Sequence, residues 1–161
     1  MQASQVVAAR ASAVDGCFTS TVHCGYSYLA YTTKRSIVIV SEYSKTEQLI
    51  PFPFGETEVR SIAWNSVTSA LSVAFPNSVY HYIPEIISEQ ETTVRRWQQV
   101  KHLRFPDIEI RQLAWLSRLG QLLICGSTIE IWKFPFNLLS GHSLTAKERA
   151  DLAEEFPELL W

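Results

Sequence analysis

Three residues near the N-terminus, Cys17, His23 and Cys24, are of the types that bind metal ions or act as nucleophiles. A structural zinc site needs four such ligands directed at one point. His23 and Cys24 are adjacent, and successive side chains of a strand point to opposite faces, so a strand would separate them. No second pair of ligands stands at a matching spacing. We therefore expect buried thiols and a surface imidazole, with no metal ion and no cofactor.

The other histidines and the serines form no catalytic pattern. His81 lies between Tyr80 and Tyr82 in an alternating strand, so we expect a hydrogen-bonded strand histidine there. His102 and His142 have no neighbouring acid or thiol in a recognisable arrangement. The chain contains neither a Gly-x-Ser-x-Gly nucleophile elbow nor a phosphate-binding GxxxxGK[ST] loop. A nucleophile, a base and an oxyanion donor cannot be assembled from these residues. The sequence thus predicts a protein that is not an enzyme.

A repeated tryptophan pattern indicates the elements that must position these side chains. A run of residues with strand-like alternation, 59–64, ends at Trp64. A second such run, 110–115, ends at Trp115, 51 positions later. A turn and a short apolar strand follow each tryptophan. Self-similarity at a fixed period is the sequence signature of repeat architectures. The apolar strands cover residues 70–75 and 121–125.

An aromatic-ended strand follows in each unit, ending at Tyr82 in one and at Trp132 in the other. These two residues lie 50 positions apart, so the units stay in register. A period of roughly 40 to 50 residues with four short strands per unit is typical of a β-propeller. Two strands of a weaker upstream copy and two fourth strands complete the pattern, at residues 28–32, 35–40, 46–52 and 95–103.

An ordinary β-sandwich also has short strands with turns between them, and it is the main alternative fold. A sandwich has no need to repeat its strand chemistry at a fixed spacing, so the repeat favours the propeller. We predict an all-β chain: a partial β-propeller of WD-repeat-like four-stranded blades, with a short C-terminal helix in an inserted segment. The helix is expected over residues 146–156, because Thr145 and Glu148 resemble a capping box and Pro157 ends the run.

The predicted organisation has three parts. Residues 1–13 are a lead-in, residues 14–134 form about two and a half blades, and residues 135–161 hold a loop, the helix and the start of a further strand at 158–161. Surface loops are expected over 84–93 and 136–144. Propellers close with about four to eight blades, so either several copies assemble a ring or the chain is part of a longer protein; the unfinished blade favours the longer protein.

The aromatic residues divide into two groups. Four stand at regular positions of the repeat and are predicted to form the blade core, since such rings bury large areas: Trp64, Tyr82, Trp115 and Trp132. Five others are candidates for partner binding, because they form a compact aromatic turn or a basic-aromatic run: Phe52, Phe54, Arg95, Arg96 and Trp97.

Charge and hydropathy exclude two classes of partner. The net charge is −2, and the longest basic runs are Lys34-Arg35 and Arg95-Arg96, whereas a duplex-binding domain is normally basic on one face. We therefore expect no nucleic acid. No stretch approaches the roughly 20 apolar residues of a transmembrane helix, and the start lacks the pattern of a secretory signal. Three unpaired cysteines suit a reducing compartment, so a cytoplasmic location is predicted.

The order of short motifs between residues 14 and 134 resembles one known family. It runs from Gly16-Cys17-Phe18 through Tyr28-Leu29-Ala30-Tyr31 and Ser36-Ile37-Val38-Ile39-Val40 to Gln48-Leu49-Ile50-Pro51, Arg96-Trp97-Gln98, Leu113-Ala114-Trp115 and Ile129-Glu130-Ile131-Trp132. This order is similar to the N-terminal WD-repeat propeller of the rabconnectin (DmX-like) proteins, the large subunit of the fungal RAVE complex. Lys133 stands where a typical WD repeat has Asp.

The resemblance implies a cytosolic scaffold that promotes association of the soluble and membrane sectors of the proton pump, the V-ATPase. The partners it implies are soluble-sector pump subunits, a small RAVE partner subunit and, in fungi, a Skp-type adaptor. It also implies peripheral association with endosomal or vacuolar membranes. The alternative is a WD-repeat scaffold of another assembly, such as a vesicle trafficking coat or a ubiquitin-ligase substrate receptor.

Overall fold

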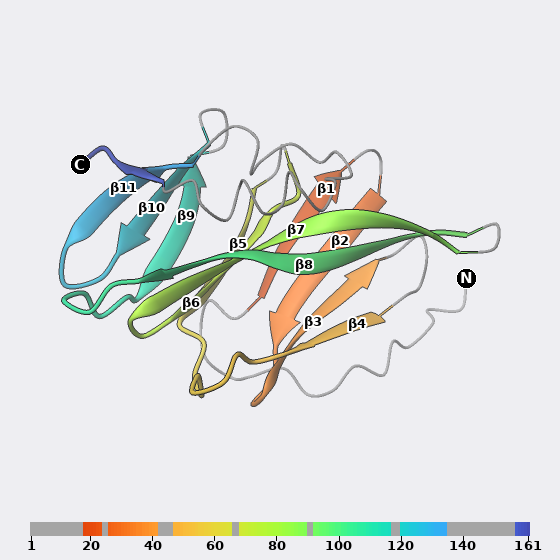
Figure 1. Cartoon of the computed structure of the whole chain (residues 1–161), viewed down its shortest axis with the longest axis horizontal. Helices are drawn as coiled ribbons and strands as arrows, with labels where there is room; N and C mark the ends of the chain where they lie inside the picture. Colours follow the sequence, from red (N-terminus) through yellow and green to blue (C-terminus); the bar gives the residue numbers. More distant parts are fainter. Residues whose placement is uncertain are drawn as a thin grey trace, which may run out of the picture.

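The computed structural model describes residues 18–23, 26–41, 47–65, 68–89, 92–116, 120–134 and 157–161. Every regular element in those ranges is a β-strand, and the strands form three four-stranded antiparallel sheets (Figure 1). The predicted all-β class is therefore confirmed. The helix expected over 146–156 lies outside the described residues, as do Cys17, Cys24 and His142.

Each sheet is formed by four strands that follow one another along the chain. The first sheet contains β1 (Phe18–His23), β2 (Tyr26–Thr32), β3 (Ser36–Ser41) and β4 (Glu47–Pro51). The second contains β5 (Ser61–Trp64), β6 (Leu71–Phe75), β7 (Ser78–Glu89) and β8 (Thr92–Arg104). The third contains β9 (Gln112–Leu116), β10 (Gln121–Cys125), β11 (Ile129–Lys133) and β12 (Glu158–Leu159). In every sheet the spatial order of the strands is their order in the chain.

The sequence repeat predicted the positions of most strands, but the structure contains more complete sheets than the repeat indicated. The fourth strands expected at 46–52 and 95–103 correspond to β4 and β8. The strand expected at 158–161 is β12, which pairs with β11 and gives the third sheet its fourth strand. The described residues thus contain three four-stranded sheets, where the repeat indicated about two and a half units.

The prediction of a surface loop over residues 84–93 is wrong. Strand β7 continues to Glu89 and β8 begins at Thr92, so the two form a long hairpin whose register includes Ile86 with Arg95 and Ile87 with Val94. Isoleucine, threonine and valine favour extended backbone, and their preference outweighs the polar, acidic composition of this segment. One register shift interrupts the hairpin, between His81 and Tyr82.

The three sheets lie side by side, with the second between the other two (Figure 1). The first strand of the second sheet, β5, lies against β1 on one side and β9 on the other. Trp64 on β5 donates its indole N–H to the Thr19 carbonyl on β1, and the Leu113 amide on β9 donates to Ser61 Oγ on β5. The first strands of successive sheets are therefore neighbours.

The first two strands of the second sheet, β5 and β6, are buried on both faces, and their side chains alternate between two cores. Ile62 and Trp64 face the first sheet, whereas Ala63 faces the third. The alternation follows from the two-residue period of a strand. Every residue of β5 and β6 is buried, whereas β9, β10 and β11 each include half-buried or exposed positions.

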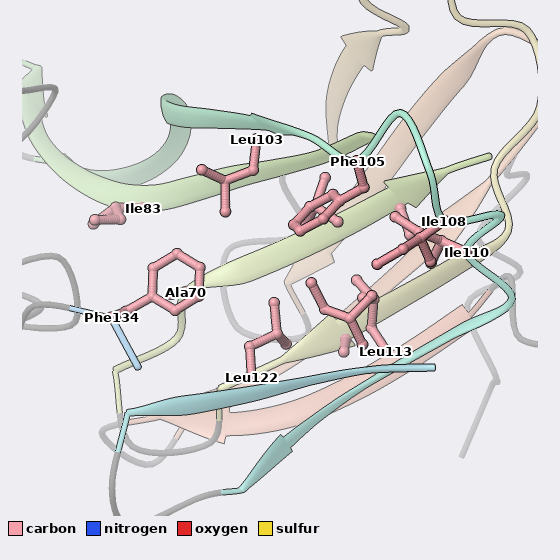
Figure 2. Close-up of a cluster of buried hydrophobic side chains, with 13 residues drawn as sticks. Ala70, Ile83, Leu103, Phe105, Ile108, Ile110, Leu113, Leu122 and Phe134 are labelled. Atoms are coloured by element: carbon pink, nitrogen blue, oxygen red, sulfur yellow. The ribbon is translucent and has the colours of Figure 1, made fainter. Parts of the chain in front are cut away.

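The core between the second and third sheets is drawn in Figure 2, where Leu113 and Leu122 point from the third sheet toward the second. Phe105 and Ile108, from the connection between β8 and β9, close one end of this core. Phe134, which follows β11, packs in the same cluster. The β4–β5 connection, the β6–β7 turn and the β8–β9 connection meet at one end of the second sheet, and they form the site described next.

Candidate functional site

A cleft of about 470 Å³ lies at the loop end of the second sheet. One part of its wall comes from the β4–β5 connection, another from the β6–β7 turn, and the third from the end of β8 and the residue pair that follows. The lining residues are Gly55, Glu56, Thr57, Pro76, Asn77, Ser78, Arg104 and Pro106.

The first wall is shaped by a tight turn. The Glu56 amide donates to the Pro53 carbonyl at 3.0 Å, and Gly55, the third residue of the turn, has a φ of +89°. A residue with a side chain rarely adopts this conformation, which explains the glycine. The turn leaves Phe54 entirely exposed, at a relative accessibility of 106%. An aromatic ring thus projects into solvent beside the cleft.

The second wall is held by Asn77. Its Nδ2 donates to the Ile108 carbonyl at 2.8 Å, and its own carbonyl accepts the Phe105 amide at 2.8 Å. The Ile110 amide donates in turn to the Pro76 carbonyl at 2.7 Å. These bonds fasten the β6–β7 turn to the β8–β9 connection, so the two loops form one continuous wall.

The floor and rim of the cleft carry opposite charges. Ser78 Oγ donates to the Glu56 carboxylate, and the Tyr80 hydroxyl donates to the same carboxylate oxygen at 3.4 Å. Burial and the nearby Glu56 raise the pKa of Tyr80. Arg104, the residue of β8 that pairs with Ser78, also lines the cleft and is exposed. The cleft therefore offers a guanidinium to a ligand while its carboxylate is occupied by two hydroxyls.

His102 packs against Tyr80 beside the cleft. Its ring stacks on Tyr80, with centroids 4.2 Å apart and planes 7° from parallel. Burial, and then the positive charge of Arg104, lower the pKa of His102. Both effects disfavour a positive charge on the imidazole beside Arg104.

The five predicted partner-binding residues do not form one surface. Phe54 is exposed beside the cleft, whereas Phe52 packs edge-on against Phe75 with ring centroids 5.3 Å apart. Arg96 is exposed on β8, about 26 Å along the strand from Arg104 at 3.3 Å per residue. The side chain of Arg95 lies outside the described residues.

Trp97, the fifth of these residues, is a core residue with 4% of its surface exposed. Its indole N–H donates to the Ser69 carbonyl at 2.8 Å, and its ring contacts Tyr28 and Trp64 edge-on. Gln48 on β4 accepts from the Trp97 amide and donates to the Trp97 carbonyl. Successive side chains of β8 point to opposite faces, so Trp97 is buried while Arg96 next to it is exposed. The basic residues that precede Trp97 therefore did not indicate its exposure.

The four tryptophan and tyrosine positions predicted for the core lie at the two junctions between sheets. Trp64 and Tyr82 are buried between the first and second sheets. Trp115 and Trp132 are partly buried and pack against the core between the second and third sheets. Trp132 also donates its indole N–H to Glu130 at 2.7 Å.

A buried polar group joins the second and third sheets. Ser72 Oγ lies 2.8 Å from His81 Nδ1, and the Trp115 indole N–H donates to the same Ser72 oxygen at 3.1 Å. Burial, and then the positive charge of Lys101, lower the pKa of His81 to about 3. The imidazole contacts Phe134 edge-on at 4.3 Å and is closed off from solvent. This arrangement places a neutral imidazole inside a core, where it is linked through Ser72 to the third sheet.

The sequence did not indicate the cleft, and the reason is physical. Its polar residues come together through strand register, which pairs Ser78 with Arg104 and Tyr80 with His102. Glu56 joins them from a different sheet connection. The alternation of Ser78 and Tyr80 along β7 was a usable signal, but the register that places β8 beside them was not visible.

No protein-family model matches this chain, and no curated protein sequence matches it significantly. Within the part of the chain that the structure describes, no three His, Cys, Asp or Glu side chains gather as a metal site would require. In the same ranges, no helix has the length and apolar character needed to cross a membrane.

Proposed function

We propose that this chain is a non-enzymatic interaction scaffold whose three sheets are consecutive blades of a β-propeller. The observation that carries the proposal is the adjacency of β1, β5 and β9, the first strands of successive sheets. In the described residues, the second sheet packs against the first sheet on one face and against the third on the other. Radially repeated four-stranded sheets are the construction principle of propellers.

The partner-binding surface in this proposal is the loop end of the second sheet. Connections between strands carry binding residues because they vary freely on a rigid scaffold. Phe54 and Arg104 are of the two residue classes, aromatic and arginine, that dominate interface energetics. Both are exposed, and they flank the same cleft.

The client in this proposal is the V-ATPase, whose soluble and membrane sectors the scaffold helps to associate. This part rests on the ordered resemblance between residues 14 and 134 and the rabconnectin propeller. The proposal therefore includes a cytoplasmic location with peripheral association with endosomal or vacuolar membranes.

Binding of the purified soluble sector of the V-ATPase to the full chain tests the function. We expect saturable binding by the native chain, and binding weaker by about tenfold or more in the double variant Phe54→Ala, Arg104→Ala, as for interface hot spots. Arg96→Ala serves as a control, because it removes the same charge far from the cleft. Absence of binding by the native chain contradicts the client. Binding that depends on Arg96 and not on the cleft contradicts the surface.

A further inference from the structure

The loop end that carries the cleft extends onto the first sheet. The β2–β3 turn carries Lys34 and Arg35, and both side chains are exposed. The Arg35 carbonyl accepts the Phe52 amide at 2.9 Å, so this turn adjoins the start of the β4–β5 connection (Figure 1). That connection continues through the exposed Phe54 to Glu56 on the wall of the cleft. The two basic side chains therefore belong to the same end of the molecule as the exposed aromatic ring.

The β2–β3 turn is held in shape by its own hydrogen bonds. Thr33 Oγ1 accepts the amides of Arg35 and Ser36, at 3.3 and 3.1 Å. The Thr33 amide donates to the Ser36 carbonyl at 2.8 Å. A backbone that is already ordered loses little conformational entropy when a ligand binds the side chains it carries. Lys34 and Arg35 are thus presented on a preorganised turn.

The turn that carries Phe54 is anchored on both sides. Before it, the Phe52 amide is bonded to the β2–β3 turn. After it, the Glu56 carboxylate accepts from Ser78 Oγ, and Ser78 pairs with Arg104 in the β7–β8 hairpin. Phe54 therefore stands on a fixed turn, with the basic β2–β3 turn at one anchor and Arg104 beside the other.

Among the described residues at this end, the acids are bonded or lie toward the third sheet. Glu56 accepts from two hydroxyls. Glu58 and Glu109 both bond the Arg60 guanidinium, at 3.1 and 3.5 Å. Asp107 is exposed in the β8–β9 connection, which leads to the third sheet. The part of this end that lies on the first sheet is therefore positive, and it attracts negatively charged groups.

We propose that this surface binds an acidic protein segment. Carboxylates of the segment pair with Lys34, Arg35 and Arg104, and one of its apolar side chains packs on Phe54, since arginine and aromatic side chains contribute strongly at interfaces. A peptide can follow a concave surface that a flat membrane cannot, and Arg104 lines the cleft, so the geometry favours a protein segment over an anionic membrane. The inference rests on the binding surface of the proposed function and not on its client.

Titration of the isotope-labelled full chain with an acidic peptide, a leucine flanked by glutamates, tests the proposal by nuclear magnetic resonance. We expect amide shifts confined to the β2–β3 turn, the β4–β5 connection and the end of β8. A peptide in which lysines replace the glutamates should cause no such shifts. Added salt should weaken binding of the acidic peptide, because exposed charge pairs are screened. Shifts spread over the whole surface, or equal binding of the lysine peptide, would overturn the proposal.

A pair of matched double variants tests the basic turn. Lys34→Glu with Arg35→Glu should weaken peptide binding by about tenfold or more, because two attractions become repulsions. The control reverses two exposed charges elsewhere, Arg96→Glu with Lys133→Glu, and should change the affinity by less than about twofold. Thermal unfolding of both variants separates lost binding from lost folding. Equal losses of affinity in the two folded variants would contradict a site at the β2–β3 turn.

Phe54→Ala separates the apolar contact from the charge pairs. It should weaken binding of the leucine peptide by about fivefold or more and change that of a peptide with serine in place of leucine by less than about twofold. Vesicles of phosphatidylserine and phosphatidylcholine test the membrane alternative. Vesicle binding through Lys34, Arg35 and Phe54 without peptide binding would replace the protein segment by a membrane. A chain that binds no acidic peptide refutes this inference and leaves the pump-binding experiment untouched, whereas absence of pump binding leaves the peptide result standing.

Discussion

The indole N–H of Trp115 donates to Ser72 Oγ at 3.1 Å, and this bond crosses from the third sheet to the second. An indole can only donate, so the serine hydroxyl proton remains available for His81 Nδ1, 2.8 Å away. A chain of two hydrogen bonds therefore links the second and third sheets inside their shared core. Buried polar groups of this kind are costly to leave unpaired.

Replacing Trp115 by Phe tests that link. The ring remains but the donor is lost, so we expect the free energy of unfolding to fall by about 1 kcal/mol or somewhat more. Urea unfolding measures the change. Ser72→Ala should lower stability similarly, and the double variant should lose less than the sum of the two, because both single changes break one network. Strictly additive losses would contradict the coupling.

The buried His81 predicts a stability that depends on pH. Its pKa is about 3 in the folded chain and about 6.5 when unfolded, so the unfolded chain binds more protons between these values. Stability is therefore fully present above about pH 6.5 and falls as the pH decreases toward 3, by at most about 1.4 kcal/mol per pH unit from this group. His102, whose pKa is lowered by burial and then by Arg104, acts in the same direction. Unfolding curves at several pH values measure the slope.

The control for this pH effect is His81→Asn, which keeps an acceptor where Nδ1 lies but does not titrate. We expect the variant to be less stable at pH 7.5 and to show a shallower dependence between pH 6.5 and 4. An unchanged slope would show that other groups account for the acid sensitivity.

Gln48 is predicted to stabilise the contact between the outer strands of the first and second sheets. Its side-chain amide bonds both the N–H and the C=O of Trp97. Gln48→Ala leaves both groups without that partner, and we expect a loss of about 1–3 kcal/mol in unfolding free energy. Gln99→Ala, an exposed change on β8, should lie within about 0.5 kcal/mol of the native chain. Equal effects of the two changes would refute this role.

Gly126 is predicted to be irreplaceable for a reason of space. A β-carbon there would lie 2.3 Å from the Glu109 carbonyl oxygen and 2.8 Å from Ile108 Cγ2. The obstacle is largely backbone, so Gly126→Ala should force the β10–β11 turn away from the β8–β9 connection at a cost of about 1–3 kcal/mol. Thermal unfolding, with Ser127→Ala as the neighbouring control, measures it. Equal melting temperatures for the two variants would contradict the close approach.

The fold was predictable where local pattern and tertiary packing agree. The repeated Ala-Trp sequence located Trp64 and Trp115 on equivalent first strands, and the alternation around Tyr82 indicated a strand. Trp97 is buried although two arginines precede it, because the alternation of β8 directs it to the face opposite Arg96. Strand periodicity outweighs local charge in deciding which side chains face a core.

The cleft was not predictable, because no local pattern encodes it. Glu56 and Ser78 meet through the packing of the β4–β5 connection on the second sheet. The pairing register of the β7–β8 hairpin directs Arg104 toward the cleft. A shift of this register by one residue would direct its side chain to the other face of the sheet. Phe54 was indicated by the aromatic turn, and its exposure follows from the conformation of Gly55.

The arrangement of the sheets is tested most directly by nuclear Overhauser contacts in the isotope-labelled chain. The account predicts contacts from the Trp64 indole N–H to Thr19 and from the Leu113 amide to the Ser61 side chain, because β5 lies between β1 and β9. Contacts joining β1 directly to β9, with the Trp64 and Leu113 contacts absent, would contradict a radial array and favour a sandwich.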